Sequence, residues 1–252
     1  MSSIPQAEPQ GQSTQRAWLA PMWQAVAPYT VPPAAAGIAI VPVFYGFMAK
    51  SALQMGGRMP PIEVISTLKK GCQTAPTVGA IVGTQMIVQN LVEKALQKGA
   101  GNQQTQNFPM MLASAAIVGA LSAPILAVFN GQTMGQTAFQ SLKSLSAKQT
   151  SAIVARETSF LFSLRVSEPI AKEMERLCGK SPAVDYGSAF VSGVVGSLIG
   201  HPADTALTLW QKGMKVKNAR QLMRGGPAKA VAVGGFSMGY KKVTELLSPA
   251  SE

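Results

Sequence analysis

The segment SLIGHPADTALTLWQ, residues 197–211, decides how this chain has to fold. Most of its residues are apolar or small, yet it contains His201, Pro202 and Asp204. A carboxylate held away from water is costly unless a cation or several hydrogen-bond donors compensate it. The segment therefore predicts an apolar helix in which Asp204 has a partner from elsewhere in the chain.

Charged residues are few and unevenly spaced along the whole sequence. Of the 252 residues 47% are hydrophobic and 13% are charged, and that charged share is about half the usual value for soluble domains. No Asp, Glu, Lys or Arg occurs in residues 17–49, 71–92, 99–142 or 186–203. A helix needs about 20 mostly apolar residues to cross the hydrocarbon core of a bilayer. These runs predict an all-α membrane protein with several transmembrane helices.

The composition argues against nucleic-acid binding and against catalysis. The net charge is +11, but the basic residues follow the ends of the apolar runs and form no patch with interleaved aromatic residues. Cys72 and Cys178 have neither metal-ligand nor disulfide spacing, and a single histidine completes no zinc site. We therefore expect no enzyme activity, no catalytic residue, no metal and no cofactor.

Three prolines divide the chain into similar units. Pro42, Pro124 and Pro202 are 82 and 78 residues apart, and each follows a helix rich in small residues. Gly37 and Gly119 lie five residues before the first two prolines, and small residues at such positions let membrane helices approach closely. Each unit is expected to hold a proline-kinked helix, a polar loop with room for a short surface helix, and a second helix that a basic residue opens.

The predicted organisation is a polar tail followed by one transmembrane domain. The tail covers residues 1–30 and has no secretory-signal layout, and the domain covers residues 31–252. Its three repeats are placed at about residues 31–100, 106–180 and 184–250, which gives six transmembrane helices. The loops after the odd helices carry eleven basic residues and one acid, Glu63. By the positive-inside rule these loops face the matrix or cytoplasm, and both termini lie on the opposite side.

This layout resembles the mitochondrial carrier family across essentially the whole chain after residue 30. In that family each odd helix ends with a proline, an acid two residues on, basic residues after it and often a glutamine; Pro202, Asp204 and Gln211 fit this pattern. The even helices of the family open with a basic residue and a glycine, as Lys70–Gly71 and Arg224–Gly225 do. The resemblance implies a six-helix, three-fold pseudosymmetric bundle in the mitochondrial inner membrane, with basic loops in the matrix and termini in the intermembrane space. It also implies that cardiolipin binds at the two basic-glycine pairs, and a helix N-terminus is a natural phosphate site.

The charges that close the matrix side of working carriers are largely missing. The resemblance places an acid and a basic residue in each repeat, joined between helices by salt bridges. Five of these six positions are apolar here and one keeps its acid, Asp204; the apolar five are Phe44, Phe47, Leu126, Phe129 and Leu207. The ring of salt bridges is therefore predicted to be absent.

Asp204 is nevertheless expected to be paired. The family partner of the third-repeat acid is the first-repeat basic residue, whose place Phe47 takes, but Lys50 lies about one helical turn further on the same face. We predict an Asp204–Lys50 salt bridge, with His201 as an alternative neighbour and a wet loop or cavity as the alternative environment.

The middle of the bundle offers one polar wall. The positions where the family binds substrate are Val78 and Ala232, whereas the middle repeat has Arg156, Glu157 and Arg165 within its second helix. Charges inside a membrane helix either line a cavity or form an ion pair that fixes the helix, and both interpretations stay open.

Three functions are compatible with these observations. The first is a carrier-derived structural or accessory subunit of a larger membrane complex, with its fold and its lipid contacts retained. The second is an atypical mitochondrial solute carrier that exchanges a small, anionic metabolite. The third is an outer-membrane carrier homologue that acts as an insertase or scaffold.

Overall fold

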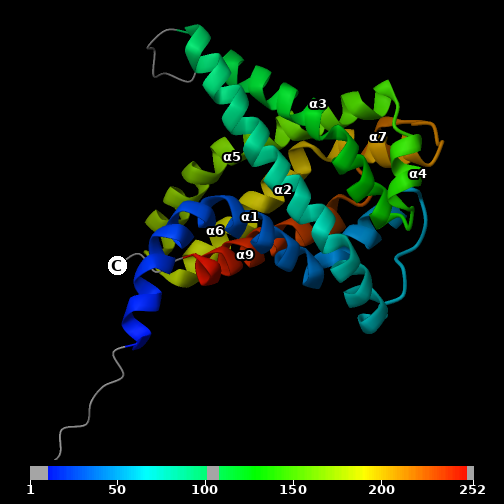
Figure 1. Cartoon of the computed structure of the whole chain (residues 1–252). Coiled ribbons are helices and arrows are strands. Elements are labelled where there is room, and N and C mark those ends of the chain that lie inside the picture. The colour runs from blue at the N-terminus through cyan, green and yellow to red at the C-terminus, as the bar shows by residue number, and fades with distance from the viewer. Residues whose placement is uncertain (1–10, 101–107, 249–252) are drawn as a thin grey trace, which may run out of the picture.

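The structure is a computed structural model that describes residues 11–100 and 108–248, and every regular element in these residues is a helix. Figure 1 shows the arrangement of the helices. Their bounds are α1 (Gly11–Gln54), α2 (Val64–Ala100), α3 (Phe108–Thr133), α4 (Ala138–Lys143), α5 (Ala147–Cys178), α6 (Pro182–Ile199), α7 (His201–Gln211), α8 (Ala219–Leu222) and α9 (Gly226–Leu247).

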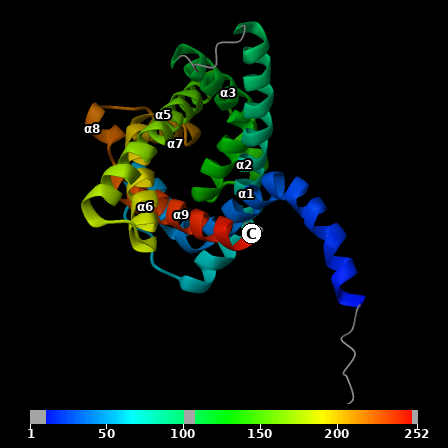
Figure 2. The ribbon, with the colours of Figure 1, turned by 90° about the vertical axis from the view of Figure 1, so that its left-hand side faces the viewer.

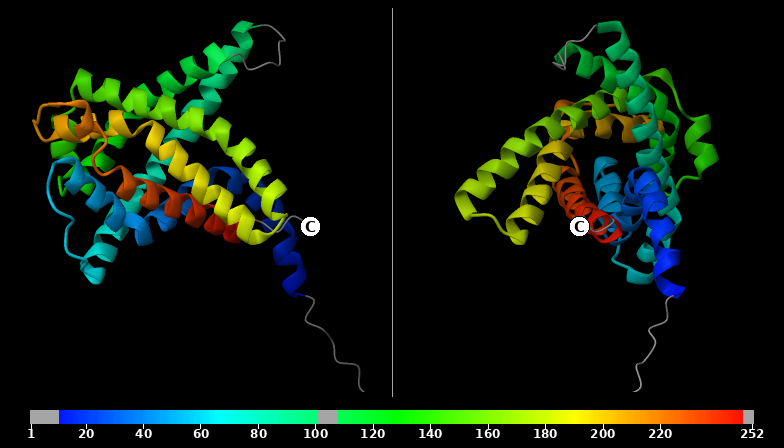
Figure 3. Two further views of the ribbon diagram at one scale, coloured as in Figure 1. Left: turned by 180° about the vertical axis from the view of Figure 1, so that it is seen from behind. Right: turned by 60° about the vertical axis from the view of Figure 1, so that its left-hand side comes forward.

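The long helices form a closed ring. α1, α2, α3, α5, α6 and α9 each pack on the next helix in this order, and α9 returns to α1. Figure 3 shows α6 and α9 running side by side, and the short helices α4 and α8 lie in the connections that precede α5 and α9. The element order agrees with the predicted order of an odd helix, a loop and an even helix.

The three repeat prolines act differently. α1 and α3 continue through Pro42 and Pro124, whereas the third odd helix breaks at Gly200 into α6 and α7, which meet at 59°. Pro202 lies in the first turn of α7, where a missing N–H leaves no hydrogen bond unmade. In the third repeat the predicted bend is therefore present, and it is a break between two helices.

The hydropathy of the helices supports fewer spans than the six predicted. Within the described residues, Met22–Gln54 and Ala113–Thr133 are long and apolar enough to cross a membrane, and the bent pair of α6 and α7 adds a third span if it counts as one. The helices α2, α5 and α9 are long enough but more polar; Arg156 and Glu157, for example, lie side by side within α5. The structure therefore shows an all-helical protein with two or three candidate membrane spans.

The first helix begins earlier than the predicted tail boundary at residue 30. α1 starts at Gly11 and its N-terminal part extends away from the other helices, as Figure 2 shows. The charge-free run already starts at Ala17. The polar composition of the first residues did not indicate this helix, which continues directly into the first candidate span.

Small residues bring the helix backbones close together. A Cβ atom on Gly37 would lie 3.2 Å from the Ala75 carbonyl oxygen of α2, and one on Gly119 would lie 3.2 Å from the Val154 Cα atom of α5. α1 approaches α9 more closely still, because a Cβ atom on Gly46 would lie 2.6 Å from the Ala232 Cβ atom. The predicted role of Gly37 and Gly119 in close helix packing is confirmed.

Candidate functional site

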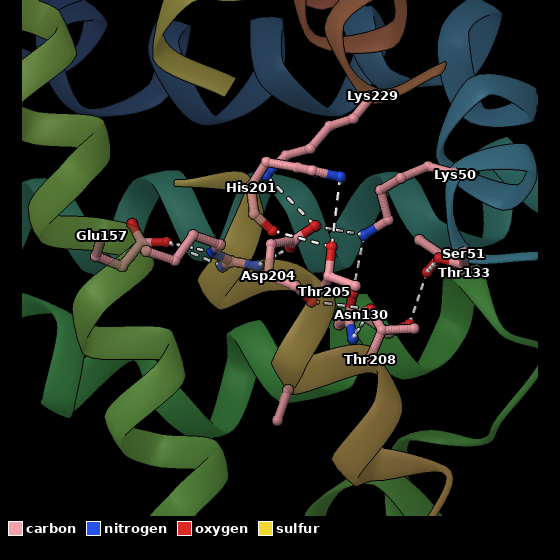
Figure 4. A network of polar contacts seen from close by, with 12 residues as sticks. Lys50, Ser51, Asn130, Thr133, Glu157, His201, Asp204, Thr205, Thr208 and Lys229 are labelled. Carbon is pink, nitrogen blue, oxygen red and sulfur yellow. Dashed lines mark hydrogen bonds and ion pairs between the residues drawn. The ribbon is translucent and has the colours of Figure 1, made fainter. Parts of the chain in front are cut away.

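Asp204 lies at the centre of a buried polar cluster where five helices meet. The break at Gly200 places it in the first turn of α7, where the helix dipole favours a negative charge. Its side chain is 3% exposed. Figure 4 shows the side chains of Lys50 and Lys229 approaching this carboxylate from two different helices.

Three cations share the Asp204 carboxylate. The Lys50 Nζ atom of α1 lies 2.9 Å from Oδ2, and the Lys229 Nζ atom of α9 lies 3.3 Å from the same oxygen. The Arg156 Nη1 atom of α5 lies 3.3 Å from Oδ1. The predicted Lys50–Asp204 pair is therefore confirmed, while the sharing of this carboxylate by α5 and α9 was not predicted.

His201, the predicted alternative partner, makes other contacts. Its side chain is fully buried, and its Nε2 atom donates a hydrogen bond of 2.9 Å to the Arg224 carbonyl oxygen. The Thr205 hydroxyl donates to the His201 carbonyl oxygen at 3.0 Å. His201 thus ties α7 to the start of α9 and leaves the Asp204 carboxylate to the three cations.

Arg156 and Glu157 form an ion pair. This agrees with one of the two interpretations of the charges in α5, an ion pair that fixes the helix. The Arg156 Nη2 atom lies 2.9 Å from Glu157 Oε1, and Gln85 of α2 donates to Glu157 Oε2 at 2.9 Å. Arg156 therefore bridges Glu157 and Asp204, which links α2, α5 and α7. Arg165 belongs to α5, but its side chain lies outside the described residues.

Amide side chains extend the cluster to α3 and form hydrogen bonds with its charged groups. Lys50 Nζ donates to Asn130 Oδ1 at 3.2 Å, and Asn130 Nδ2 donates to Gln211 Oε1 at 2.7 Å. Gln211, the predicted family glutamine, in turn donates to the Ala127 carbonyl oxygen at 3.0 Å. Gln54 Nε2 donates to Asp204 Oδ2 at 3.2 Å. The ends of α1, α3 and α7 are therefore joined by a continuous hydrogen-bonded network.

The apolar residues at the positions where the resemblance implies charges pack beside this network. Phe44 and Leu207 are 1% and 0% exposed, and Leu126 is also buried. The rings of Phe47 and Phe129 meet edge to face with their centroids 5.6 Å apart. Where the resemblance places salt bridges, this chain has an aromatic and aliphatic layer next to one shared carboxylate.

The two positions at which the resemblance implies substrate contacts are occupied by buried apolar side chains. Val78 and Ala232 are 6% and 3% exposed, and both belong to the same buried cluster as Ile40, Phe44 and Phe47. Neither residue has a polar side chain, so they contribute no side-chain group that could recognise a charged solute.

A second group of polar contacts joins the start of α6 to the end of α9. Lys241 Nζ lies 3.2 Å from Asp185 Oδ1, and the Tyr186 hydroxyl donates to Glu245. The ammonium groups of Lys241 and Lys242 lie 5.8 and 5.7 Å from the centre of the Tyr186 ring. These contacts fix α6 to α9 at the surface.

The four predicted lipid-binding residues divide into two kinds. Arg224 and Gly225 immediately precede α9, and Gly225 has φ = 77°, which a glycine adopts without strain. Lys70 is exposed, but α2 begins at Val64, so Lys70 and Gly71 lie inside the helix and do not open it. A Cβ atom on Gly71 would lie 3.0 Å from the Val41 carbonyl oxygen, so close packing on α1 explains this glycine.

The sequence analysis missed Lys229 and Asn130. Lys229 is the only charged residue between Gly226 and Tyr240, and an isolated lysine in an apolar helix calls for a buried partner. Asn130 lies six residues after Pro124, near the end of an apolar helix, and carries no charge that would mark it. In the part of the chain that the structure describes, no three His, Cys, Asp or Glu side chains gather as a metal site would require.

Comparison of the chain with family models, curated proteins and solved structures finds no match. The function therefore has to be argued from the buried cluster and from the arrangement of the helices.

Proposed function

We propose that this chain is a carrier-like bundle of six membrane-crossing helical segments, fixed in one closed conformation, that acts as a structural or accessory subunit of a larger membrane complex. Its proposed location is the mitochondrial inner membrane, with the basic loops in the matrix and the termini in the intermembrane space. The six segments of the proposal are α1, α2, α3, α5, the bent pair α6 and α7, and α9.

The observation that carries this proposal is the sharing of Asp204 by three helices besides its own. Lys50, Arg156 and Lys229 reach the carboxylate from α1, α5 and α9. A transporter must open and reform the contacts that close it in every cycle. Opening this bundle would have to separate, in one step, three ion pairs that hold α1, α5 and α9 to α7. Such a cluster favours a permanent closure over a gate.

The apolar interior supports the same function. Val78 and Ala232 are packed against Ile40 and Phe44, and the Phe47–Phe129 contact fills the level of the missing salt bridges. Binding a charged solute normally takes several convergent donors. Arg156 is already paired with Glu157 and Asp204. An atypical solute carrier, the second function, would have to break these ion pairs before Arg156 could bind a solute.

The exposed basic residues support contacts with anionic lipid. Lys70 in the first part of α2 and Arg224 just before α9 are both exposed, in a chain that carries a net charge of +11. Basic groups at this level attract anionic headgroups, and cardiolipin is the lipid that the proposed location would supply.

The test is native electrophoresis of membranes solubilised in mild detergent, with the chain tagged at its C-terminus. We expect it to migrate with an assembly several times its own mass of 26.4 kDa. A variant that lacks residues 2–20 keeps the first candidate span and is the first deletion to examine for loss of the assembly. A Glu173→Gln variant, altered at an exposed residue, is the matched control.

Two results would contradict the proposal. One is migration as a monomer together with solute exchange by the purified chain in liposomes, which would establish the carrier function. Thermal-shift screening with nucleotides, phosphate and carboxylates would then identify the solute class. The other is impaired membrane insertion of other proteins when the chain is depleted, which would favour the insertase.

A further inference from the structure

The buried cluster around Asp204 contains more positive than negative charge. Lys50 and Lys229 are 2% and 7% exposed, and the Arg156 side chain is 14% exposed. Against these three cations stand two carboxylates, those of Asp204 and Glu157. His201 lies in the same region but is neutral or positive in either protonation state, so it cannot offset the difference. Among the side chains that the structure describes, one positive charge in the interior of the bundle has no counter-charge.

Lys229 is the cation that the protein compensates least. Lys50 has the Asp204 carboxylate at 2.9 Å and the Asn130 amide oxygen at 3.2 Å, and Arg156 has two carboxylates. An ammonium group has three N–H donors, yet among the described residues the contact of the Lys229 ammonium is one oxygen of Asp204 at 3.3 Å. Figure 4 shows its side chain reaching down from α9 toward that oxygen.

The position of Lys229 in its helix increases the imbalance. It lies in the first turn of α9, where the helix dipole is positive and where Gly225 provides no side-chain cap. A cation at this end of a helix is disfavoured, whereas an anion is stabilised there. Charge excess, unused N–H donors and helix dipole all favour a negative ion beside the Lys229 ammonium.

We propose that the Lys229 ammonium binds one small inorganic monovalent anion of the chloride type. The burial of Lys229 excludes a lipid headgroup, and a single excess charge calls for a single negative charge. The anion completes the charge balance of the cluster and so acts as a structural ligand of the closed bundle. This inference does not depend on whether the chain is a subunit or a carrier.

The test compares the thermal stability of the purified protein in sodium chloride and in sodium gluconate at equal ionic strength. Gluconate is too large for a buried monovalent-anion site, so the native protein is expected to have a Tm at least about 2 °C higher in chloride. Bromide is expected to replace chloride. An equal Tm in chloride and gluconate would overturn the proposal, because the cluster would then be balanced without an anion.

Lys229→Met removes the excess charge while Lys50 and Arg156 still compensate Asp204. We expect this variant to lose the difference between chloride and gluconate and to be no less stable in gluconate than the native protein. Lys241→Met, at the exposed end of the same helix, should keep the full difference. If Lys229→Met fails to fold, Lys229→Gln keeps an N–H donor toward Asp204 and answers the same question. An undiminished chloride effect in either Lys229 variant would assign the anion to another place.

Discussion

The Lys50 ammonium and the Asp204 carboxylate lie 2.9 Å apart in the interior of the bundle, although 154 residues separate them in the chain. Their contact joins the end of α1 to the start of α7, and so it joins the first repeat of the predicted architecture to the third. Lys229 and Arg156 approach the same carboxylate from α9 and α5. One acid therefore sets the mutual position of four helices.

This sharing predicts that Asp204 contributes more to stability than any of its three partners. Asp204→Asn leaves Lys50 and Lys229 buried without a counter-charge, and we expect a loss of about 3–5 kcal/mol in the free energy of unfolding. Lys50→Met leaves two cations on the carboxylate and should cost about 1–3 kcal/mol. Denaturant titration in detergent micelles, followed by tryptophan fluorescence, measures both values.

The double variant Lys50→Met/Asp204→Asn isolates the pair. Removing both partners should recover part of the combined loss, because the ammonium that Asp204→Asn leaves unpaired is then absent. Glu173→Gln changes an exposed acid and should alter stability by less than about 0.5 kcal/mol. Additive losses in the double variant would show that Lys50 and Asp204 are not energetically coupled.

Part of this cluster could be predicted from the sequence. An acid inside a segment without other charges needs a partner, and Lys50 is the first charge after a run that begins at Ala17. The resemblance to the mitochondrial carriers implied that this partner lies in the first repeat, and Lys50 is the basic residue about one helical turn beyond the implied position. The helical class, in contrast, followed from the charge-free runs alone.

The remaining partners depend on how the helices rotate about their axes. Whether Arg156 faces Asp204 or the lipid depends on the rotation of α5, and that rotation follows from contacts such as Gly200 against Arg156. Lys229 reaches Asp204 because His201 holds the start of α9 against α7. Such contacts join side chains that are distant in the sequence, and neither charge-free runs nor proline spacing contain them.

The edge-to-face contact of Phe47 and Phe129 is predicted to stabilise the packing of α1 on α3. Their centroids lie 5.6 Å apart, and Phe47 is 8% exposed. Phe47→Ala should cost about 3–5 kcal/mol, since it removes a large buried side chain. In a double-mutant cycle with Phe129→Ala, the two losses should fall short of additivity by about 0.5–1.5 kcal/mol. Phe47→Leu keeps most of the volume and should cost clearly less; an equal cost would mean that packing volume is not what this site requires.

Gly46 and Ala232 are predicted to be a compensating pair at the contact of α1 with α9. A Cβ atom on Gly46 would lie 2.6 Å from the Ala232 Cβ atom, so Gly46→Ala should cost about 1–3 kcal/mol. The second change Ala232→Gly removes the clashing atom and should restore most of the loss. Gly239→Ala is the control in α9, because its new Cβ atom would make an ordinary contact of 3.7 Å with Ala39. Failure of Ala232→Gly to rescue Gly46→Ala would place the helix contact elsewhere.

The two cysteines test the orientation proposed for the bundle. Cys72 and Cys178 are both free and exposed. Cys72 follows Lys69 and Lys70 in the first part of α2, whereas Cys178 ends α5, a helix whose 32 residues are about 48 Å long. Because α5 starts at the end of the bundle where α1, α3 and α7 meet, its last residue belongs to the opposite end. The two thiols should therefore lie on opposite sides of the membrane.

If the chain has the proposed location, a membrane-impermeant maleimide applied to mitochondria without their outer membrane should react with Cys178 and leave Cys72 unmodified. Permeabilisation of the inner membrane should then allow Cys72 to react, since its thiol is exposed in the folded chain. Cys72→Ser and Cys178→Ser assign each signal to one residue. Labelling of Cys72 alone before permeabilisation would invert the orientation and place the basic loops outside, against the positive-inside rule. Equal labelling of both thiols would mean that α5 does not cross the membrane, which would remove the six-segment architecture on which the proposed function rests.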